Sequence, residues 1–168
     1  MNGGAVTGKN VSVSGIIRRT SFIVADADAA ASFYQAIFGW TRFYDNETAV
    51  DRRFPPSAPG VTPAQIILLK ADDPYIGMLG FMEYLDHTPA PSVDKDRTKL
   101  GMGDALLVIE TNDMEGTYKR AGEAGARLVS EPIDWTVTDY SGEGVIKLAT
   151  FSFFDPNGLY VEVNTRRD

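Results

Sequence analysis

Few side chains in this sequence are suited to nucleophilic or metal-based catalysis. The 168-residue chain contains no cysteine and a single histidine, His87. Without cysteine there are no disulfide bonds, thiolate nucleophiles or thiolate-bound metals. One histidine is too few for an iron site built from two histidines and a carboxylate. Any chemistry must therefore come from carboxylates, arginines and aromatic side chains.

Two aromatic residues and the histidine lie in segments that we expect to be irregular. Trp135 and Tyr140 fall within residues 132–146, which we expect to form a long loop. Both rings could form a lid over a cavity or simply cover the core. His87 lies in a polar segment with two prolines, where a surface position is expected more often than a ligand role.

Composition and charge restrict the partners. Hydrophobic residues make up 43% of the chain and charged residues 23%, as in ordinary globular domains. The formal net charge is −7 and there is no basic run, so we expect binding neither to nucleic acid nor to a membrane surface. No apolar run reaches the roughly 18 residues of a transmembrane helix, and the start does not resemble a signal peptide. We expect a cytoplasmic protein with a flexible tail at residues 1–14.

The first half is predicted to form a strand, a helix and three further strands. Residues 16–24 are rich in β-branched and aromatic side chains, which favour a strand. Asp26 can cap a helix that carries Phe33 and Ile37 on one face, and Gly39 suits its C-terminal end. The further strands are expected at residues 40–47, 64–70 and 77–84.

The same order of elements returns after a polar segment at residues 85–101, which we interpret as a linker that could also close over a site. A helix capped by Asn112 or Asp113 follows the next strand. The strands of this half are expected at residues 104–110, 127–131, 145–154 and 159–164, the last two being joined by the turn Asp155-Pro156-Asn157-Gly158.

The repeated order indicates an internal duplication. A shift of 85 residues places Arg19 on Asp104 and Phe33 on Tyr118, with apolar positions falling on apolar positions. We therefore predict one α+β domain, built from two βαβββ units that form a curved mixed sheet around a cavity. The units are expected at residues 15–84 and 102–168.

Two segments resemble a known family. VADADAAASFYQAIFGW, residues 24–40, and FFDPNGLYVEVN, residues 153–164, resemble the opening and closing signatures of the vicinal oxygen chelate superfamily, which includes glyoxalases, bleomycin-resistance proteins and dioxygenases. The resemblance covers about residues 16–165. It implies a U-shaped sheet, a cavity that usually holds a divalent metal, and a homodimer.

The resemblance also implies four metal-binding positions. They fall on Arg19, Gly80 (with Glu83 as a nearby alternative), Asp104 and Glu162. A guanidinium carries only donors and stays charged, so Arg19 cannot bind a cation. Two carboxylates alone make a weak, open site. We therefore assign no metal ligands and name no cofactor; a divalent metal stays open through the resemblance but is disfavoured.

Arg19 is instead expected to replace the cation. It could sit between Asp104 and Glu162 as a structural salt bridge, or it could anchor a carboxylate or enolate oxygen of a ligand. Glu162 could act as a general base, together with Asp104 and Arg19 as the catalytic group. The residues expected to bind substrate are Ser21, Gly80, Trp135, Tyr140 and Tyr160.

Three functions remain open. The first is an enzyme, such as a lyase or isomerase, that acts on a small oxygenated organic molecule; an extradiol iron dioxygenase is disfavoured by the single histidine. The second is a metal-independent protein that sequesters a drug or metabolite, as the bleomycin-resistance branch does. The third is a scaffold whose cavity serves a partner domain.

Overall fold

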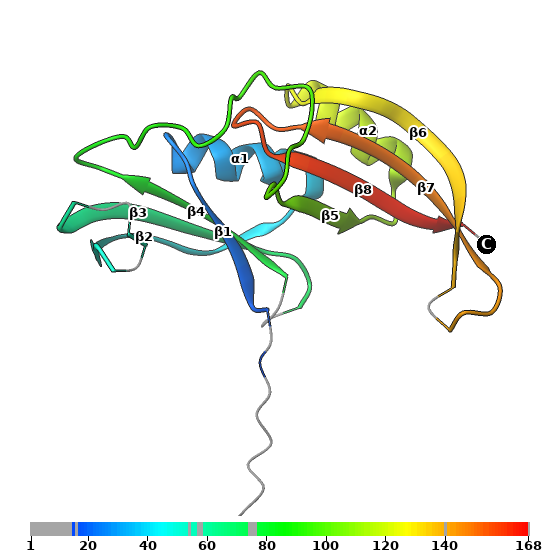
Figure 1. Cartoon of the computed structure of the whole chain (residues 1–168), viewed down its shortest axis with the longest axis horizontal. Helices are drawn as coiled ribbons and strands as arrows, with labels where there is room; N and C mark the ends of the chain where they lie inside the picture. The colour runs from blue at the N-terminus through cyan, green and yellow to red at the C-terminus, as the bar shows by residue number, and fades with distance from the viewer. Residues whose placement is uncertain are drawn as a thin grey trace, which may run out of the picture.

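The computed structural model describes residues 15–167 except 16, 54, 57, 58, 74–76 and 140. The predicted tail at residues 1–14 and Tyr140 therefore lie outside the described residues. The chain forms two four-stranded sheets, each accompanied by one helix (Figure 1). In chain order the elements are β1 (Arg19–Ile23), α1 (Ala27–Phe38), β2 (Thr41–Asp51), β3 (Val61–Lys70), β4 (Met78–Tyr84), β5 (Leu106–Glu110), α2 (Met114–Glu123), β6 (Arg127–Thr138), β7 (Val145–Phe154) and β8 (Tyr160–Arg167).

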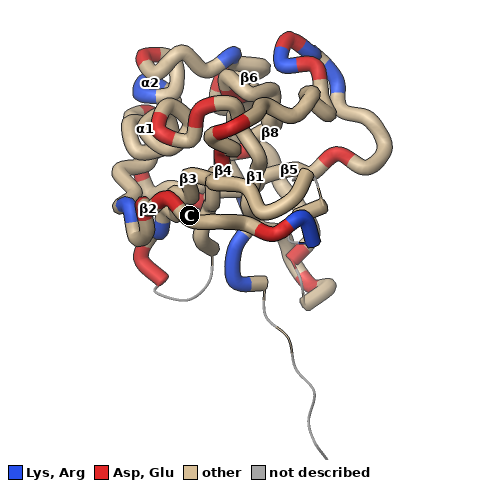
Figure 2. The backbone as a smooth tube through the Cα atoms, turned by 90° about the vertical axis from the view of Figure 1, so that its left-hand side faces the viewer, with Lys and Arg blue, Asp and Glu red and all other residues tan. Residues whose placement is uncertain are grey.

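Both sheets have the same topology. The strand order is β1-β4-β3-β2 in the first sheet and β5-β8-β7-β6 in the second. In each sheet the first strand pairs with the fourth in parallel, and the remaining pairs are antiparallel. The predicted fold class, two βαβββ units with curved sheets, is confirmed. Figure 2 shows acidic and basic residues spread over both units. No helix in the described part of the chain has the length and apolar character needed to cross a bilayer.

The helix ends follow the predicted caps. The side chain of Asp26 accepts a hydrogen bond from the Ala29 amide at 2.8 Å, which begins α1. Gly39 has φ 70° and donates its amide to Gln35, which ends this helix. Of the two residues predicted as caps of α2, Asp113 has this role and accepts a hydrogen bond from the Gly116 amide.

The larger of two hydrophobic clusters among the described residues joins the two units. It contains residues from both helices and from the helix-covered side of both sheets. The rings of Phe33 on α1 and Phe153 on β7 meet edge to face at a centroid distance of 6.0 Å. Arg120 on α2 donates to the Ile37 carbonyl at 2.7 Å, so the helices are also joined by a polar contact. Because the core spans both units, neither helix-covered sheet face is open to solvent.

Tyr34 and Asp155, one from each quoted motif, meet inside this core. The Tyr34 hydroxyl donates to Asp155 Oδ2 at 3.2 Å, and the two residues are 0% and 1% exposed. Oδ1 of Asp155 accepts the amides of Asn157 and Leu159, each at 2.8 Å. Burial raises the pKa of Asp155 above its ordinary range, although these hydrogen bonds oppose the shift. The carboxyl group therefore fixes the β7–β8 turn and links the two units.

The long loop predicted at residues 132–146 is wrong, because β6 continues to Thr138. Pro132 is the reason why the sequence did not indicate a strand here, since proline is rare inside a sheet. It lies at a shift in register between Ser130 and Ile133, and β6 is an edge strand, where a missing amide hydrogen bond is tolerated. Trp135 consequently sits on a strand instead of a mobile lid.

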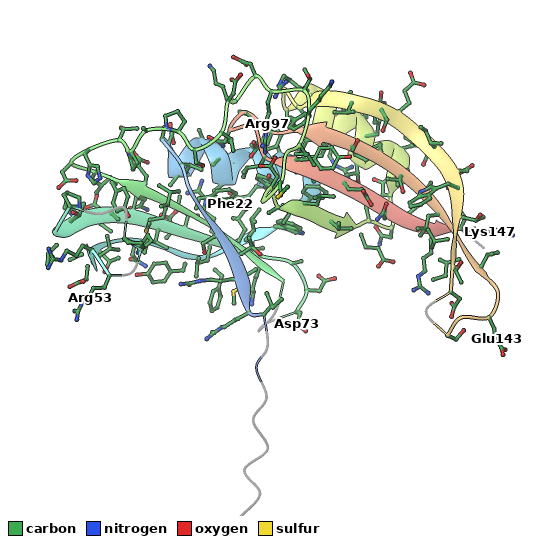
Figure 3. All side chains as sticks on the ribbon, viewed as in Figure 1. Phe22, Arg53, Asp73, Arg97, Glu143 and Lys147 are labelled. Atoms are coloured by element: carbon green, nitrogen blue, oxygen red, sulfur yellow. The ribbon has the colours of Figure 1, made fainter. Side chains whose placement is uncertain are left out.

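The linker at residues 85–101 contains no helix or strand, and its second half is held on the second unit instead of hanging free as a flap. Arg97 donates to the Gly158 carbonyl at 2.9 Å and pairs with Asp104 at 2.6 Å. Arg127 donates to the Arg97 carbonyl at 3.0 Å. Figure 3 shows Arg97 where the linker passes over the end of the second sheet. These contacts fix the path of the chain between the two units.

Candidate ligand-binding site

Glu162 lies on the side of the second sheet that no helix covers. Its neighbours on β8, Val161 and Val163, are fully buried in the common core, so Glu162 must point the other way. The register places Val108 of β5 on one side of it and Ser152 of β7 on the other. We call this surface the second helix-free face, and we define it by the residues of β5–β8 that share the orientation of Glu162.

A chain of hydrogen bonds crosses this face and ends at Glu162. Trp135 on β6 donates from Nε1 to the Thr150 hydroxyl at 2.6 Å. Thr150 on β7 donates in turn to Oδ1 of Asn164, and Asn164 Nδ2 donates to Glu162 Oε1 at 3.0 Å. Every link points toward the carboxylate. The arrangement orients the Glu162 carboxylate, because a donor faces one of its oxygens.

Exposed apolar side chains flank this polar row. Val108 is 58% exposed and Trp135 43%, although both are large hydrophobic residues. Leu106 and Ile133 lie on the same face and are also exposed. A small number of oriented polar groups among apolar side chains is typical of small-molecule sites. Sequence reasoning identified Trp135 and Glu162 but missed Thr150 and Asn164.

Asp104 does not belong to this face. The helix caps Asp26 and Asp113 are 87 residues apart, so the true shift between the units is 87 and not 85. Arg19 therefore corresponds to Leu106, and Asp104 precedes β5 by two residues. The carboxylate of Asp104 accepts the Gly101 amide and pairs with Arg97, and these contacts lower its pKa in that order of strength. Its role is to hold the linker.

Gly80 occupies the position in the first unit that Glu162 occupies in the second. Gly80 pairs with Ser21 and Glu162 pairs with Val108, and the shift of 87 places Ser21 on Val108, so their partners on the fourth strand of each unit correspond as well. A Cβ atom on Gly80 would lie 2.5 Å from Ser21 Oγ and 2.9 Å from Leu68 Cδ2, so a side chain there would require both neighbours to move. The alternative ligand Glu83 points to the helix-covered side, where it accepts the Ala27 amide at 2.9 Å.

Arg19 lies on the helix-free face of the first sheet, beside Met78. It lines a hollow of about 480 Å³, and neither Asp104 nor Glu162 lines this hollow. In the described residues, Arg19 forms no ion pair with a carboxylate. The structure thus does not bring together the predicted group of Arg19, Asp104 and Glu162 within one chain.

Two other residues have local partners. Tyr160, predicted to bind substrate, packs edge to face against Phe154 at 5.4 Å. His87 is more enclosed than the sequence indicated: its ring stacks on Tyr84 at 4.6 Å and Nδ1 contacts Asp86 at 2.7 Å. Its Nε2 atom is buried without a partner among the described residues.

The donor set does not fit a divalent metal. With the corrected shift, the four positions implied by the family resemblance hold Arg19, Gly80, Leu106 and Glu162. Only Glu162 offers a ligand atom, and hard divalent ions need several oxygen ligands. Across the described ranges, no group of three or more histidine, cysteine, aspartate or glutamate side chains could hold an ion.

Comparisons with known proteins agree with this fold. The model of the Glyoxalase/Bleomycin resistance protein/Dioxygenase superfamily matches residues 16–163. A glyoxalase family protein from Bacillus cereus superposes with a TM-score of 0.73 at 14% identity, covering 95% of this chain and 99% of that one. TioX from Micromonospora sp. ML1 gives 0.51 at 16% identity, covering 91% and 100%. A glyoxalase I variant from Zea mays gives 0.57 at 18% identity, covering 88% and 44%. No curated protein matches the sequence.

Proposed function

Because the chain belongs to the glyoxalase/bleomycin resistance protein/dioxygenase superfamily, we propose that it is a cytoplasmic protein that binds a small oxygenated organic molecule without a metal ion. The proposed site is the second helix-free face. The observation that carries this proposal is the row of donors from Trp135 through Thr150 and Asn164 to the Glu162 carboxylate. The absence of cysteine supports a reducing compartment.

The chemistry of Glu162 indicates which ligand group it would meet. Asn164 supplies one donor to Oε1, and the described residues supply none to Oε2. An ionised carboxylate only accepts hydrogen bonds, so the ligand must present a donor such as a hydroxyl group. The exposed side chains of Val108, Ile133 and Trp135 would cover the apolar part of the molecule.

Trp135 provides a direct test of this binding. The sequence has two tryptophans, so Trp40→Phe leaves Trp135 as the single fluorescent reporter. We expect phenolic molecules, screened in pairs with their O-methylated counterparts, to change its emission, and the hydroxyl member to bind at least about tenfold more tightly. The O-methylated counterpart has no hydroxyl hydrogen to donate, so Glu162 Oε2 would be covered by the ligand without a hydrogen-bond donor. Fluorescence titration excited at 295 nm measures both constants.

Two variants with the same change of charge serve as the comparison. Glu162→Gln keeps the acceptor for Asn164 and should abolish the preference for the hydroxyl member. Glu110→Gln changes an exposed acid of β5 on the same face and should leave the preference for the hydroxyl member intact. A phenol screen without any change in Trp135 emission would contradict the proposal. So would a rise in melting temperature with Mn²⁺, Zn²⁺ or Ni²⁺ that Glu162→Gln removes, because it would indicate a metal site.

Catalysis by Glu162 is the second candidate. The free Oε2 atom favours it, because a carboxylate oxygen without a protein donor can accept a proton from a carbon beside a carbonyl group. In this case Glu162 would serve as the general base of a lyase or isomerase. Protein-dependent exchange of such a proton into D₂O, lost in Glu162→Gln, would distinguish catalysis from sequestration.

We also propose that two copies associate through their helix-free faces. Ile23 and Tyr44 on the first sheet, and Leu106 and Val108 on the second, are exposed apolar residues on these faces. A second copy would bury them and enclose the ligand. Light scattering after gel filtration should give about 37 kDa, twice the chain mass of 18.3 kDa. Val108→Lys should shift the protein to monomer, whereas Val145→Lys on the β6–β7 hairpin should not. A monomer in the unmodified protein would refute this association.

A further inference from the structure

Each unit has a residue pair where its second strand begins and its third strand ends. In the first unit the pair is Thr41 and Lys70, and in the second it is Arg127 and Phe154. Because the two sheets have the same strand order, these pairs occupy equivalent positions. What covers each pair can therefore be compared directly.

The linker covers the pair in the second unit. Arg127 donates to the Lys95 carbonyl at 2.5 Å and to the Arg97 carbonyl at 3.0 Å. The guanidinium of Arg97 lies 5.8 Å from the centre of the Phe154 ring and pairs with Asp104 at 2.6 Å. A segment of irregular backbone is thus held here, and its arginine meets an aromatic ring and a carboxylate.

The pair in the first unit lines a cleft instead. Thr41 and Lys70 form part of its wall, and its volume is about 340 Å³, within the range of binding sites. No residue of the linker, which the structure describes in full, lines this cleft. Phe38 of α1 and Arg120 of α2 also line it. The cleft therefore lies where the two units meet beside the helices, whereas the proposed contact between two copies uses the helix-free faces.

The cleft offers the two kinds of group that hold Arg97. The rings of Phe38 and Trp40, stacked at a centroid distance of 4.9 Å, provide an aromatic surface. Asp72 and Glu110 provide carboxylates. Both acids are exposed, and neither forms an ion pair with another residue that the structure describes.

The cations of the cleft already have other contacts. Arg120 donates to the Ile37 carbonyl at 2.7 Å and pairs with Asp113 at 3.1 Å. The Nζ atom of Lys70 lies 5.1 Å from the centre of the Phe43 ring, which does not line the cleft. The two acids without an ion pair therefore make the cleft complementary to a positively charged group.

We propose that this cleft is a docking site for an arginine-bearing segment of a partner protein. The guanidinium would lie over Trp40 and pair with Asp72, while Glu110 adds negative charge. The linker favours a peptide over a free small molecule, because a segment of chain covers the equivalent position in the second unit. The site uses none of the hydrogen-bonded residues that lead to Glu162, so it is independent of the function proposed above.

Two blocked pentapeptides test this assignment: GSRTG, and the same peptide with citrulline, which is uncharged but similar in shape, in place of arginine. Trp135→Phe leaves Trp40 as the single tryptophan, so its emission reports on the cleft. We expect the arginine peptide to change this emission and to bind at least about tenfold more tightly than the citrulline peptide, because only a guanidinium forms a charge-assisted pair. Agmatine, a small guanidine without peptide groups, should bind more weakly than the arginine peptide.

Single substitutions then locate the carboxylate. Asp72→Asn should weaken binding of the arginine peptide at least about fivefold. Asp73→Asn, with the same loss of charge at a residue that does not line the cleft, should change it less than about twofold. Glu162→Gln should have no effect, which separates this cleft from the second helix-free face.

Four results would overturn the assignment. They are an unchanged Trp40 emission at ~5 mM arginine peptide, equal binding of the two peptides, equal effects of the two aspartate variants, and binding of agmatine as tight as that of the arginine peptide. The last result would indicate a small-molecule site instead of a docking site for a protein.

Discussion

Asp155→Ala is expected to lower the free energy of unfolding by about 3–5 kcal/mol, a large share of the total stability of a domain of this size. The carboxyl group accepts hydrogen bonds from the Asn157 and Leu159 amides and from the Tyr34 hydroxyl. Alanine would leave these donors without a partner in the protein, at a cost of about 1–3 kcal/mol for each one that stays buried. Urea unfolding followed by circular dichroism measures the change.

Tyr34→Phe is the matched control, because it removes only the hydroxyl end of this network. This variant should lower the free energy of unfolding by about 1 kcal/mol. The ring still fills the core, and Asp155 Oδ2 loses only the hydrogen bond from the Tyr34 hydroxyl. If the two variants were equally stable, the hydrogen bonds of the β7–β8 turn would contribute nothing, and Asp155 would not be the link between the units.

The pH dependence of stability tests the effect of burial on the Asp155 carboxyl group. The folded protein binds the Asp155 proton more tightly than the unfolded chain does, because burial raises the folded pKa above the ordinary value of 3.8. The contribution of this group to stability is therefore full below about pH 3.8 and falls as the pH rises through the folded pKa. Asp155→Asn cannot ionise, so the stability of the unmodified protein relative to this variant should decrease with rising pH.

Gly158→Ala is expected to be the second most damaging change, with a loss of about 2–4 kcal/mol. The residue has φ +80°, where a side chain costs about 1–2 kcal/mol. A Cβ atom would also lie 2.9 Å from the Lys95 Cα atom and 3.0 Å from the Asp94 carbonyl oxygen. These are backbone atoms, so the linker must move and weaken its contact with Arg97. Proteolysis in the native state should become faster within residues 94–97.

Gly125→Ala separates the two parts of this cost. Gly125 has φ +88°, but nothing lies within 4 Å of the position that a Cβ atom would take, so only the backbone term of about 1 kcal/mol applies. The linker of this variant should be cut at the rate of the unmodified protein. Equal losses for the two alanine variants would show that the linker yields freely and is not fixed by the turn.

Local sequence signals predicted those parts of the fold that depend on local contacts. Asp26, Gly39 and Asp113 act on amides within a few residues, so their roles could be inferred from spacing. The extent of β6 could not, because Pro132 and a series of polar residues resemble a loop unless the strand is known to lie at an edge. The predicted shift of 85 residues was wrong for a related reason. The sequences of the two units are so dissimilar that an alignment of their strands can slip by two residues without exchanging apolar for polar positions. The helix caps Asp26 and Asp113 fix the shift at 87.

The site was predictable in part. Glu162 was found through the closing motif, and the alternation of apolar and polar residues on β7 and β8 was a signal for Thr150 and Asn164 that went unused. Phe151 and Val163 are buried, so their polar neighbours had to face outward together. Asp104 was misassigned because its partner Arg97 lies in the linker, and no periodic pattern reveals a tertiary contact of this kind.

The glycine opposite Ser21 bears on how this protein can evolve. A four-ligand metal centre at the family positions would require an acidic side chain at Gly80, whose first carbon would lie 2.5 Å from Ser21 Oγ and 2.9 Å from Leu68 Cδ2. The side chains of Ser21 and Leu68 must therefore move, or Ser21 must become smaller, before an acid at Gly80 is tolerated. Ligand side chains would also be needed in place of Arg19 and Leu106, so no single substitution brings a four-ligand centre within reach of this sequence.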